Sequence, residues 1–404
     1  MQDAVLVDAV RSPMAKGKAP KDGKPGGALS GLHPVELLGQ TVKALLERNP
    51  ALDPGEVEDF IVGCVSQVAE QAGCPGRWAW LAAGLPEHVP STTVDRRCGS
   101  SQQAADFAAQ GVIAGAYDVV IAGGVESMSR VPMGSARMGA DVYGPSATAR
   151  YAPGLVPQGI SAELVAARWK LSREALDAFS ARSHQRAAEA AATGGFDNEI
   201  VAIRTPDANG GVTSFDKDES IRPSTTAEGL AALKCAFENT DMAARFPEIS
   251  WSITAGNSSQ ITDGAAAMLI MSAERAAALG LRPRARFHAF AVASDDPITM
   301  LSGPIPATEK ALKRSGLSID QIDHYEVNEA FASVPLAWAE HFGADPSKLN
   351  PRGGAIALGH PLGASGARLM TTMLNSLEAT GGRFGLQTMC EAGGMANATI
   401  IERL

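Results

Sequence analysis

Cys98 has the residue type and the setting of a nucleophile. It follows a short β-branched run, Ser91–Val94, and precedes an alanine-rich helix that begins near Gly99. A thiol at that junction lies beside the first unpaired backbone N–H groups and the positive end of the helix dipole. Because Arg96 and Arg97 are next to it in sequence, we expect the thiol to ionise easily and to react as the thiolate. The alternative is a small buried core residue, which is the usual role of a lone cysteine.

Three further side chains, closer to the C-terminus, could move protons and stabilise charge. His360 lies in a glycine-rich stretch, Asn350–Arg368, just before a predicted helix, which disfavours the imidazolium and leaves a neutral nitrogen. Cys390 and Asn328 each stand at the end of a predicted buried strand. Strand ends that face one crevice are where α/β folds collect catalytic groups. We therefore expect these three side chains to lie near Cys98.

The elements that must position these residues form a repeat. A helix, a capped turn and a strand follow one another in residues 35–64 and again in residues 310–328. Each copy is followed by a strand, a reactive residue, a helix and another strand. In the second copy Ala355–Leu358 is expected to be the strand before His360, and residues 364–377 the helix after it. Two copies of one βαβ-rich unit explain this order.

The chain between the repeats has a different composition. Residues 126–249 are richer in Gly, Pro, Ser and Thr and contain one clear amphipathic helix, Ser172–Thr193. Insertions on an α/β scaffold commonly build the substrate face, although an ordered lid without ligand contact is the alternative. We predict an N-terminal domain of residues 1–274, with a loop-domain insertion at about 125–249, and a C-terminal domain of residues 275–404.

Composition excludes several classes of protein. The chain has 404 residues, 45% of them hydrophobic, and a net charge of −9, so it lacks the basic footprint of a protein that binds nucleic acid or anionic membranes. Its five cysteines are scattered and show no metal-site spacing, which indicates free thiols, a reducing compartment and no bound metal. The first residues already have a strand pattern, and no run approaches a membrane span. We expect a cytoplasmic protein.

Five motifs together resemble one family. They are Cys98–Ser100, Gly123–Ser129, Asn328–Ala332, Gly359–Pro361 and Cys390–Gly394. In order and spacing, over essentially the whole chain, they resemble the thiolases, which are acetyl-CoA acyltransferases. The resemblance implies a five-layered αβαβα fold of two duplicated α/β halves with a loop-domain insertion. It also implies a homodimer or homotetramer.

The resemblance assigns roles to the reactive residues. It implies that Cys98 carries the acyl group as a thioester, that His360 is its base, and that Cys390 moves a proton at the carbon of acetyl-CoA. Asn328, through a water molecule, and His360 resemble one oxyanion hole. The backbone N–H groups of Cys98 and Ala392 resemble the second. Two such holes are needed because an enolate forms next to a thioester.

The resemblance also implies a coenzyme A site. Residues 252–266 are similar to the family's pantetheine-binding segment, with Ser259 as the contacting serine, although a helix N-cap is the alternative. Arg222 and Lys234 resemble the nucleotide-binding part of the loop region. Lys234 stands where many relatives have arginine, so the adenine contact is in doubt, and Arg222 could equally be a solvated charge. Coenzyme A and acyl-CoA would be substrates, with no permanently bound cofactor.

Three departures from the family pattern concern the substrate. Pro157–Gly159 lacks the His–Met pair of short-chain biosynthetic thiolases, Cys98 is followed by Ser100–Gln103, and Glu391–Ala392 replaces a common Ile–Gly. They indicate thiolytic cleavage of longer or bulkier 3-oxoacyl-CoA in fatty acid or steroid degradation, reversible as a Claisen condensation.

Three other functions stay open at this point. They are a biosynthetic acetoacetyl-CoA thiolase, a decarboxylating condensing enzyme and a non-catalytic lipid or sterol carrier. A decarboxylating enzyme would use histidine or asparagine in place of Cys390. A carrier would have lost the reactive residues.

Overall fold

Ten strands form one continuous sheet built from two halves. The structure is a computed structural model that describes residues 2–22, 24, 26–207 and 211–404. The strand order is β10-β11-β12-β9-β1-β8-β5-β3-β4, with β2 paired to β8. The strands are β1 (Ala4–Arg11), β2 (Ala15–Lys16), β3 (Asp59–Gly63), β4 (Ser91–Val94), β5 (Val119–Ser127), β8 (Thr262–Ser272), β9 (Ala285–Ser294), β10 (His324–Val327), β11 (Phe384–Glu391) and β12 (Met395–Arg403).

Within the sheet, the strands that join the two halves are β1 and β9. Val5 pairs with Arg286 and Leu6 with Ala285, and the pairing extends no further along these two strands. Each half therefore has its own twisted sheet, and each sheet has two apolar faces to cover.

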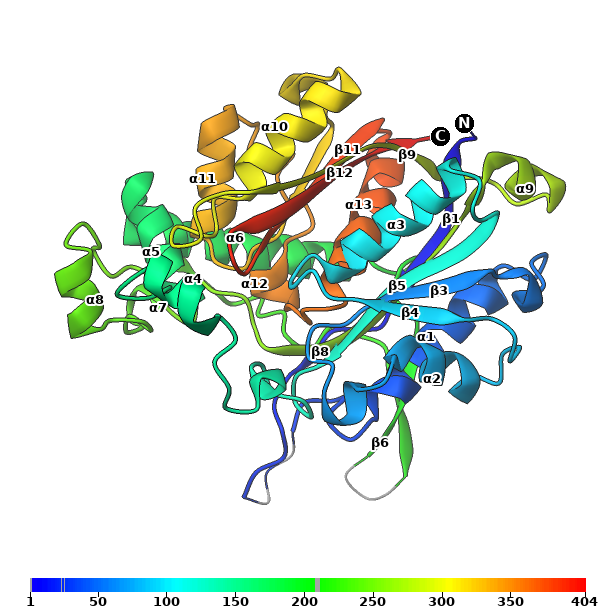
Figure 1. Cartoon of the computed structure of the whole chain (residues 1–404), viewed down its shortest axis with the longest axis horizontal. Helices are drawn as coiled ribbons and strands as arrows, with labels where there is room; N and C mark the ends of the chain where they lie inside the picture. The colour runs from blue at the N-terminus through cyan, green and yellow to red at the C-terminus, as the bar shows by residue number, and fades with distance from the viewer. Residues whose placement is uncertain (1, 23, 25, 208–210) are drawn as a thin grey trace.

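Helices cover all four faces in five layers. The principal helices are α1 (Pro34–Arg48), α2 (Pro75–Ala82), α3 (Ser100–Ile113), α10 (Pro304–Ser315), α11 (Ser333–Phe342) and α13 (Ser365–Thr380). Helices α1 and α2 pack on the outer face of the first half, and α10 and α11 on the outer face of the second. Helices α3 and α13 lie between the halves, where their apolar residues form one cluster with both sheets (Figure 1). This arrangement confirms the predicted fold class.

The middle layer is possible because glycines let its helices approach closely. A Cβ atom on Gly366 of α13 would lie 2.3 Å from the backbone nitrogen of Gln102 in α3, and one on Gly63 of β3 would lie 2.4 Å from that of Ser101. Real side chains do not tolerate such distances, so these positions require glycine. The close approach brings the N-terminal ends of α3 and α13 together at the candidate site.

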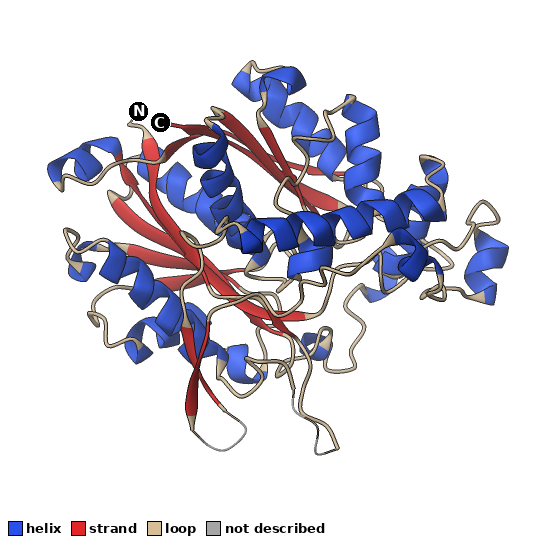
Figure 2. Ribbon diagram, turned by 180° about the vertical axis from the view of Figure 1, so that it is seen from behind, coloured by secondary structure: helices blue, strands red, loops and turns tan. Residues whose placement is uncertain are grey.

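The insertion forms a group of helices and one hairpin beside the five layers. They are α4 (Gly144–Arg150), α5 (Gln158–Arg168), α6 (Arg173–Ala192), α7 (Ala227–Ala231), α8 (Thr240–Arg245) and the hairpin β6 (Ile203–Pro206) and β7 (Val212–Phe215). Helices α4, α5, α7 and α8 extend to one side of the molecule in both ribbon views (Figures 1 and 2). Helix α6 begins after Ser172, whose side chain accepts a hydrogen bond from the Ala175 N–H, and it ends before Thr193, as predicted.

The remaining helical segments are short. They are α9 (Ala273–Ala278), α12 (Ala355–Leu358) and the 3₁₀ turns Pro54–Glu56, Ala69–Gln71, Ser135–Arg137 and Ile319–Gln321.

The strand expected at Ala355–Leu358 is wrong, because these residues form helix α12. The place beside β10 where a counterpart of β4 would lie holds only a single bridge, between Tyr325 and Leu349. The Ile356 N–H instead donates to the Glu329 carboxylate, and the Gly354 N–H donates to the Ser183 hydroxyl. A short apolar run does not distinguish a strand from a buried helical turn.

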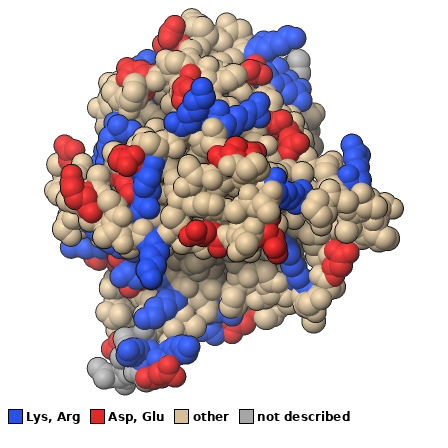
Figure 3. Space-filling view, turned by 90° about the vertical axis from the view of Figure 1, so that its left-hand side faces the viewer, with Lys and Arg blue, Asp and Glu red and all other residues tan. Residues whose placement is uncertain are grey.

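The surface in Figure 3 shows basic and acidic side chains interspersed, with no broad field of one sign. Across residues 2–22, 24, 26–207 and 211–404, no helix has the length and apolarity needed to cross a bilayer. All five cysteines are free.

Candidate active site

The two cysteines singled out by sequence lie close together in the interior. Cys98 occupies the turn between β4 and α3, Cys390 is the penultimate residue of β11, and their exposed fractions are 5% and 1%. Cys98 packs in one cluster with Leu362 and Met389, which are close neighbours in sequence of His360 and Cys390. Burial, and next the negative charge that Cys98 would carry, raise the pKa of Cys390 well above its ordinary value. The two thiols are therefore close enough to interact electrostatically.

The expectation that Cys98 ionises easily is wrong. Burial raises the pKa of this thiol to about 12, and the charge of Glu391 adds to the effect. Arg97 opposes this shift only weakly, because its side chain is 49% exposed and pairs with Asp95 at 3.4 Å. A cysteine in this setting rests as the neutral thiol, so it needs a base to take its proton as it attacks.

His360 is the candidate for that base, and its hydrogen bonds indicate its tautomer. The Ser365 hydroxyl donates to the Pro361 carbonyl oxygen at 2.8 Å, which uses its only hydrogen. Ser365 Oγ itself lies 2.6 Å from His360 Nδ1, so with its hydrogen used it accepts a hydrogen bond from that nitrogen. His360 therefore carries its proton on Nδ1, and Nε2 is left as the basic nitrogen.

The environment of His360 keeps the ring neutral. Burial lowers the pKa of His360 to about 3, and the positive charge of Arg368 contributes. The backbone N–H of His360 donates to Thr262 Oγ1 at 3.0 Å, which fixes the backbone position from which the imidazole ring extends. Gly359 has φ +97°, and a Cβ atom there would lie 2.2 Å from the same Thr262 oxygen. The turn before His360 therefore requires glycine.

Asn328 lies beside the basic nitrogen of His360. Its Nδ2 lies 3.5 Å from His360 Nε2. Its Oδ1 is buried and has no hydrogen-bond partner within the described part of the chain. Asn328 follows β10 directly, and Ala392 lies in the turn between β11 and β12, one residue past the end of β11. Once His360 has taken up a proton on Nε2, its N–H and the Asn328 amide would face the same point, and they could hold an oxyanion there.

Sequence reasoning missed two buried carboxylates and a serine that support this geometry. Glu126 accepts hydrogen bonds from the backbone N–H groups of Val65, Ser66 and Gly363, and so ties the end of β3 to the chain after His360. Glu329 accepts hydrogen bonds from Ser183, Asn350 and Ile356. The serine is Ser365, whose oxygen contacts His360 Nδ1. Both glutamates lie inside motifs that the sequence analysis quoted, but their partners are distant in sequence.

Two of the three residues predicted to bind coenzyme A, Ser259 and Arg222, lie on segments connected to His360. Ser259 is not in a helix, so the N-cap alternative is wrong. The next residue, Gln260, accepts a hydrogen bond from the His360 N–H and a second from Arg222 Nη2 at 3.0 Å. Arg222 is exposed, and Gln260 links it to His360. The Gln260 side chain accepts the hydrogen bond from Arg222, and the Gln260 backbone carbonyl accepts the one from His360. Lys234 is exposed and precedes Cys235, which pairs with Thr254.

No metal centre is evident in the described residues. Residues 2–22, 24, 26–207 and 211–404 contain no group of three or more His, Cys, Asp or Glu placed to hold a metal ion.

Comparison with known proteins covers nearly the whole chain. The family model "Thiolase, N-terminal domain" matches residues 4–274, and "Thiolase, C-terminal domain" matches residues 281–403. The chain belongs to the thiolase family. Thiolases are acyltransferases. The two matched domains together cover nearly the whole chain.

Curated thiolases resemble the chain over its full length. It is 47% identical to "Steroid 3-ketoacyl-CoA thiolase FadA6" of Mycobacterium tuberculosis, over 100% of this chain and 95% of that protein. It is 46% identical to "3-ketoacyl-CoA thiolase" of Pectobacterium carotovorum, over 100% of both chains. The crystal structure of the Bacillus anthracis acetyl-CoA acetyltransferase matches with a TM-score of 0.87 at 35% identity, covering 100% of this chain and 99% of that one.

Proposed function

We propose that this thiolase cleaves 3-oxoacyl-CoA with coenzyme A, releasing acetyl-CoA and a shortened acyl-CoA. The observation that carries the proposal is the neutral His360, whose basic nitrogen faces Asn328 within a buried site that also holds two thiols. The names of the curated relatives support the direction, because both are called 3-ketoacyl-CoA thiolases. Coenzyme A and acyl-CoA are substrates in this scheme.

The first half-reaction breaks a carbon–carbon bond. Cys98 sulfur attacks the 3-oxo carbon while its proton passes to His360 Nε2. The bond between carbons 2 and 3 then breaks, leaving the shortened acyl group on Cys98 and an acetyl-CoA enolate. Cys390 donates a proton to carbon 2, and acetyl-CoA leaves. Asn328 and His360 stabilise the enolate oxygen, and the N–H groups of Cys98 and Ala392 stabilise the oxygen bound to the 3-oxo carbon.

The second half-reaction regenerates the thiol. Coenzyme A loses its thiol proton to the Cys390 thiolate and attacks the thioester, and Cys98 leaves with the proton held by His360. The pKa values fit these steps. A neutral imidazole can accept the proton. The Cys390 thiol can protonate the enolate because the enolate is the much stronger base, and the raised pKa makes the resulting thiolate a strong base.

The acyl-enzyme provides the direct test. Incubation with a 3-oxoacyl-CoA in the absence of free coenzyme A is expected to add the shortened acyl group to the peptide that contains Cys98, measured by mass spectrometry. Cys98→Ala should abolish both the adduct and turnover, whereas Cys74→Ala, a half-buried cysteine outside the site, should keep both. Turnover by Cys98→Ala would disprove the mechanism.

We propose a longer or bulkier acyl group as the substrate. The site lacks the His–Met pair of short-chain enzymes at Pro157–Gly159, and the ring of Phe237 packs against the backbone of Gly159 instead. The Mycobacterium relative named as a steroid thiolase supports the same choice. A panel of 3-oxoacyl-CoA substrates of increasing length, with and without a ring, should give the largest kcat/KM for the longer or ring-bearing members. A maximum at acetoacetyl-CoA would contradict this proposal and favour the biosynthetic alternative.

We also propose two domains, residues 1–274 and 275–404, with the insertion at about 125–249 on the substrate side, and a homodimer or homotetramer. The coenzyme A contacts are proposed at Ser259, Arg222 and Lys234.

A further inference from the structure

Glu391 is a buried carboxyl group that the mechanism above does not use. It is the last residue of β11, directly after Cys390, and its exposed fraction is 0%. Neither of its oxygens has a hydrogen-bond partner within the described part of the chain. Buried polar atoms in proteins are nearly always paired, so two unpaired oxygens on one side chain require an explanation.

The carboxyl group lies against the backbone that carries the nucleophile. An ideal Cβ on Gly99 would lie 2.0 Å from Glu391 Oε1 and 2.9 Å from Asn397 Nδ2. Glu391 therefore fills the space that glycine leaves open, one residue after Cys98 and at the N-terminal end of α3. Asn397 reaches the same place and donates to the Gly99 carbonyl oxygen at 3.1 Å.

We propose that Glu391 is a positioning residue for Cys98 and acts as an uncharged carboxylic acid. This inference rests on the proposed function. The neutral acid holds the turn at Gly99 against the end of β11, and so keeps Cys98 and Cys390 in register. It also leaves no negative charge beside the sulfur that must become a thiolate during attack.

The surrounding charges are consistent with a neutral acid. Burial raises the pKa of Glu391 to about 9, Arg96 opposes this shift, and Asp106 and Asp95 add to it. Glu391 forms no ion pair with Arg96, whose buried Nε also lacks a partner in the described residues. The charged or titratable groups around Glu391 and Cys98 are Arg96, Asp95, Arg97 and Cys98 in the turn before α3, Asp106 on α3, Glu126 on β5 and Cys390 on β11, and in the proposed mechanism also His360 before α13.

The charge of Glu391 determines how pH affects the ionisation of Cys98. Below its pKa Glu391 is neutral and does not oppose ionisation of Cys98. Above that pKa its negative charge disfavours a second negative charge on the sulfur. In the wild-type protein, ionisation of Cys98 should therefore be suppressed at high pH.

The test compares two variants by the rate at which iodoacetamide alkylates Cys98, followed by mass spectrometry from pH 7 to pH 10.5. Glu391→Gln keeps the shape and the neutral state, so we expect a wild-type rate at pH 7 and a rate on the order of 10-fold above wild type at pH 10.5, as for a shift of about one pKa unit. Glu391→Ala removes the shape as well. It should lose thiolysis activity at every pH, mainly in kcat, and Glu391→Gln should retain it at pH 7. The exposed Glu340→Gln is the matched control and should follow the wild type.

Two results would overturn the inference. One is a folded Glu391→Gln protein that reacts or turns over at least 10-fold more slowly at pH 7, which would show that a carboxylate is required. The other is the same pH course in wild type and Glu391→Gln. Alkylation does not depend on thiolysis, so a wild-type protein with normal alkylation but no cleavage of 3-oxoacyl-CoA would count against the proposed function alone.

Discussion

At the scale of single residues, the central feature of the proposed mechanism is the pairing of a neutral base with a neutral nucleophile. His360 has a pKa lowered to about 3 by burial, and Cys98 has a pKa raised to about 12 by burial. A preformed thiolate–imidazolium pair is therefore disfavoured, and the proton must move as the sulfur attacks. Ser365 matters because its oxygen keeps the proton of His360 on Nδ1 and leaves Nε2 free.

Ser365→Ala should therefore reduce kcat on the order of 10-fold, with little change in KM. Removing the acceptor for the Nδ1 proton costs about one hydrogen bond, roughly 1 kcal/mol, and each 1.36 kcal/mol is tenfold in rate. Ser376→Ala, a second buried serine on α13, is the control and should keep wild-type kinetics. Steady-state kinetics on one 3-oxoacyl-CoA measure both, and an unchanged kcat in Ser365→Ala would refute the tautomer argument.

At the scale of elements, the site depends on how closely α3 and α13 pack in the middle layer. Cys98 precedes α3 and His360 precedes α13, so a shift between the two helices would separate nucleophile and base. The contact is between backbones at Gly366 and Gln102, and Ser101 Oγ accepts a hydrogen bond from the Ala367 N–H beside it. Small residues at this contact therefore determine the relative position of Cys98 and His360 as well as the stability of the fold.

Gly366→Ala should lower the free energy of unfolding by about 3 kcal/mol, because overpacking against backbone atoms cannot be relieved by a rotamer change. It should also reduce kcat, since α13 must move away from α3. Gly31→Ala is the matched control, because a Cβ atom there would meet only Pro206, at an ordinary 3.8 Å. Urea unfolding and steady-state kinetics provide the two readouts. Wild-type stability in Gly366→Ala would contradict the packing argument.

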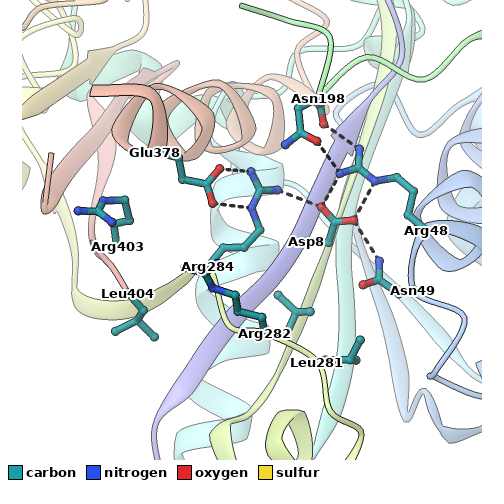
Figure 4. A pocket seen from close by; sticks show the side chains of 11 residues that line it. Asp8, Arg48, Asn49, Asn198, Leu281, Arg282, Arg284, Glu378, Arg403 and Leu404 are labelled. Carbon is teal, nitrogen blue, oxygen red and sulfur yellow. Dashed lines mark hydrogen bonds and ion pairs between the residues drawn. The ribbon is translucent and has the colours of Figure 1, made fainter. Parts of the chain in front are cut away.

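At the scale of the whole molecule, an ionic network supports the junction between the two halves. Arg284, just before β9, contacts Asp8 of β1 at 3.0 Å and Glu378 of α13 at 2.6 Å. Arg48 and Asn49, at the end of α1, bind the same aspartate. Figure 4 shows the network at the edge of a pocket of about 530 Å³. Since β1 and β9 pair at only two positions, side chains must supply part of the cohesion there.

Arg284→Ala should therefore destabilise the protein by about 2 kcal/mol. This is less than the 3–5 kcal/mol expected on breaking a fully buried pair, because Asp8 keeps Arg48 as a partner. Arg282→Ala, an exposed arginine of the same pocket, should change stability by less than about 0.5 kcal/mol. Urea midpoints of the two variants provide the comparison. Equal midpoints would show that the network does not hold the halves together.

The sequence by itself indicated the candidate residues, most of the local elements that carry them, and the family. Cys98 before a helix, and Asn328 and Cys390 at the ends of strands, were readable because turns, caps and apolar runs are local signals. Helix α6 was predicted within one residue at each end for the same reason. A repeat in the order of elements was enough to predict two similar halves.

Only the tertiary structure decided the protonation states and the supporting contacts. Local sequence suggested a thiolate at Cys98, but burial by distant segments outweighed the helix dipole and raised the thiol's pKa. Ala355–Leu358 forms a helix and not a strand because the carboxylate of Glu329, which lies just after β10, accepts a hydrogen bond from the Ile356 N–H. Glu126 and Gly363 are 237 residues apart, yet they meet at 2.8 Å. Desolvation and such contacts depend on which segments the fold brings together, and no local pattern in the chain specifies them.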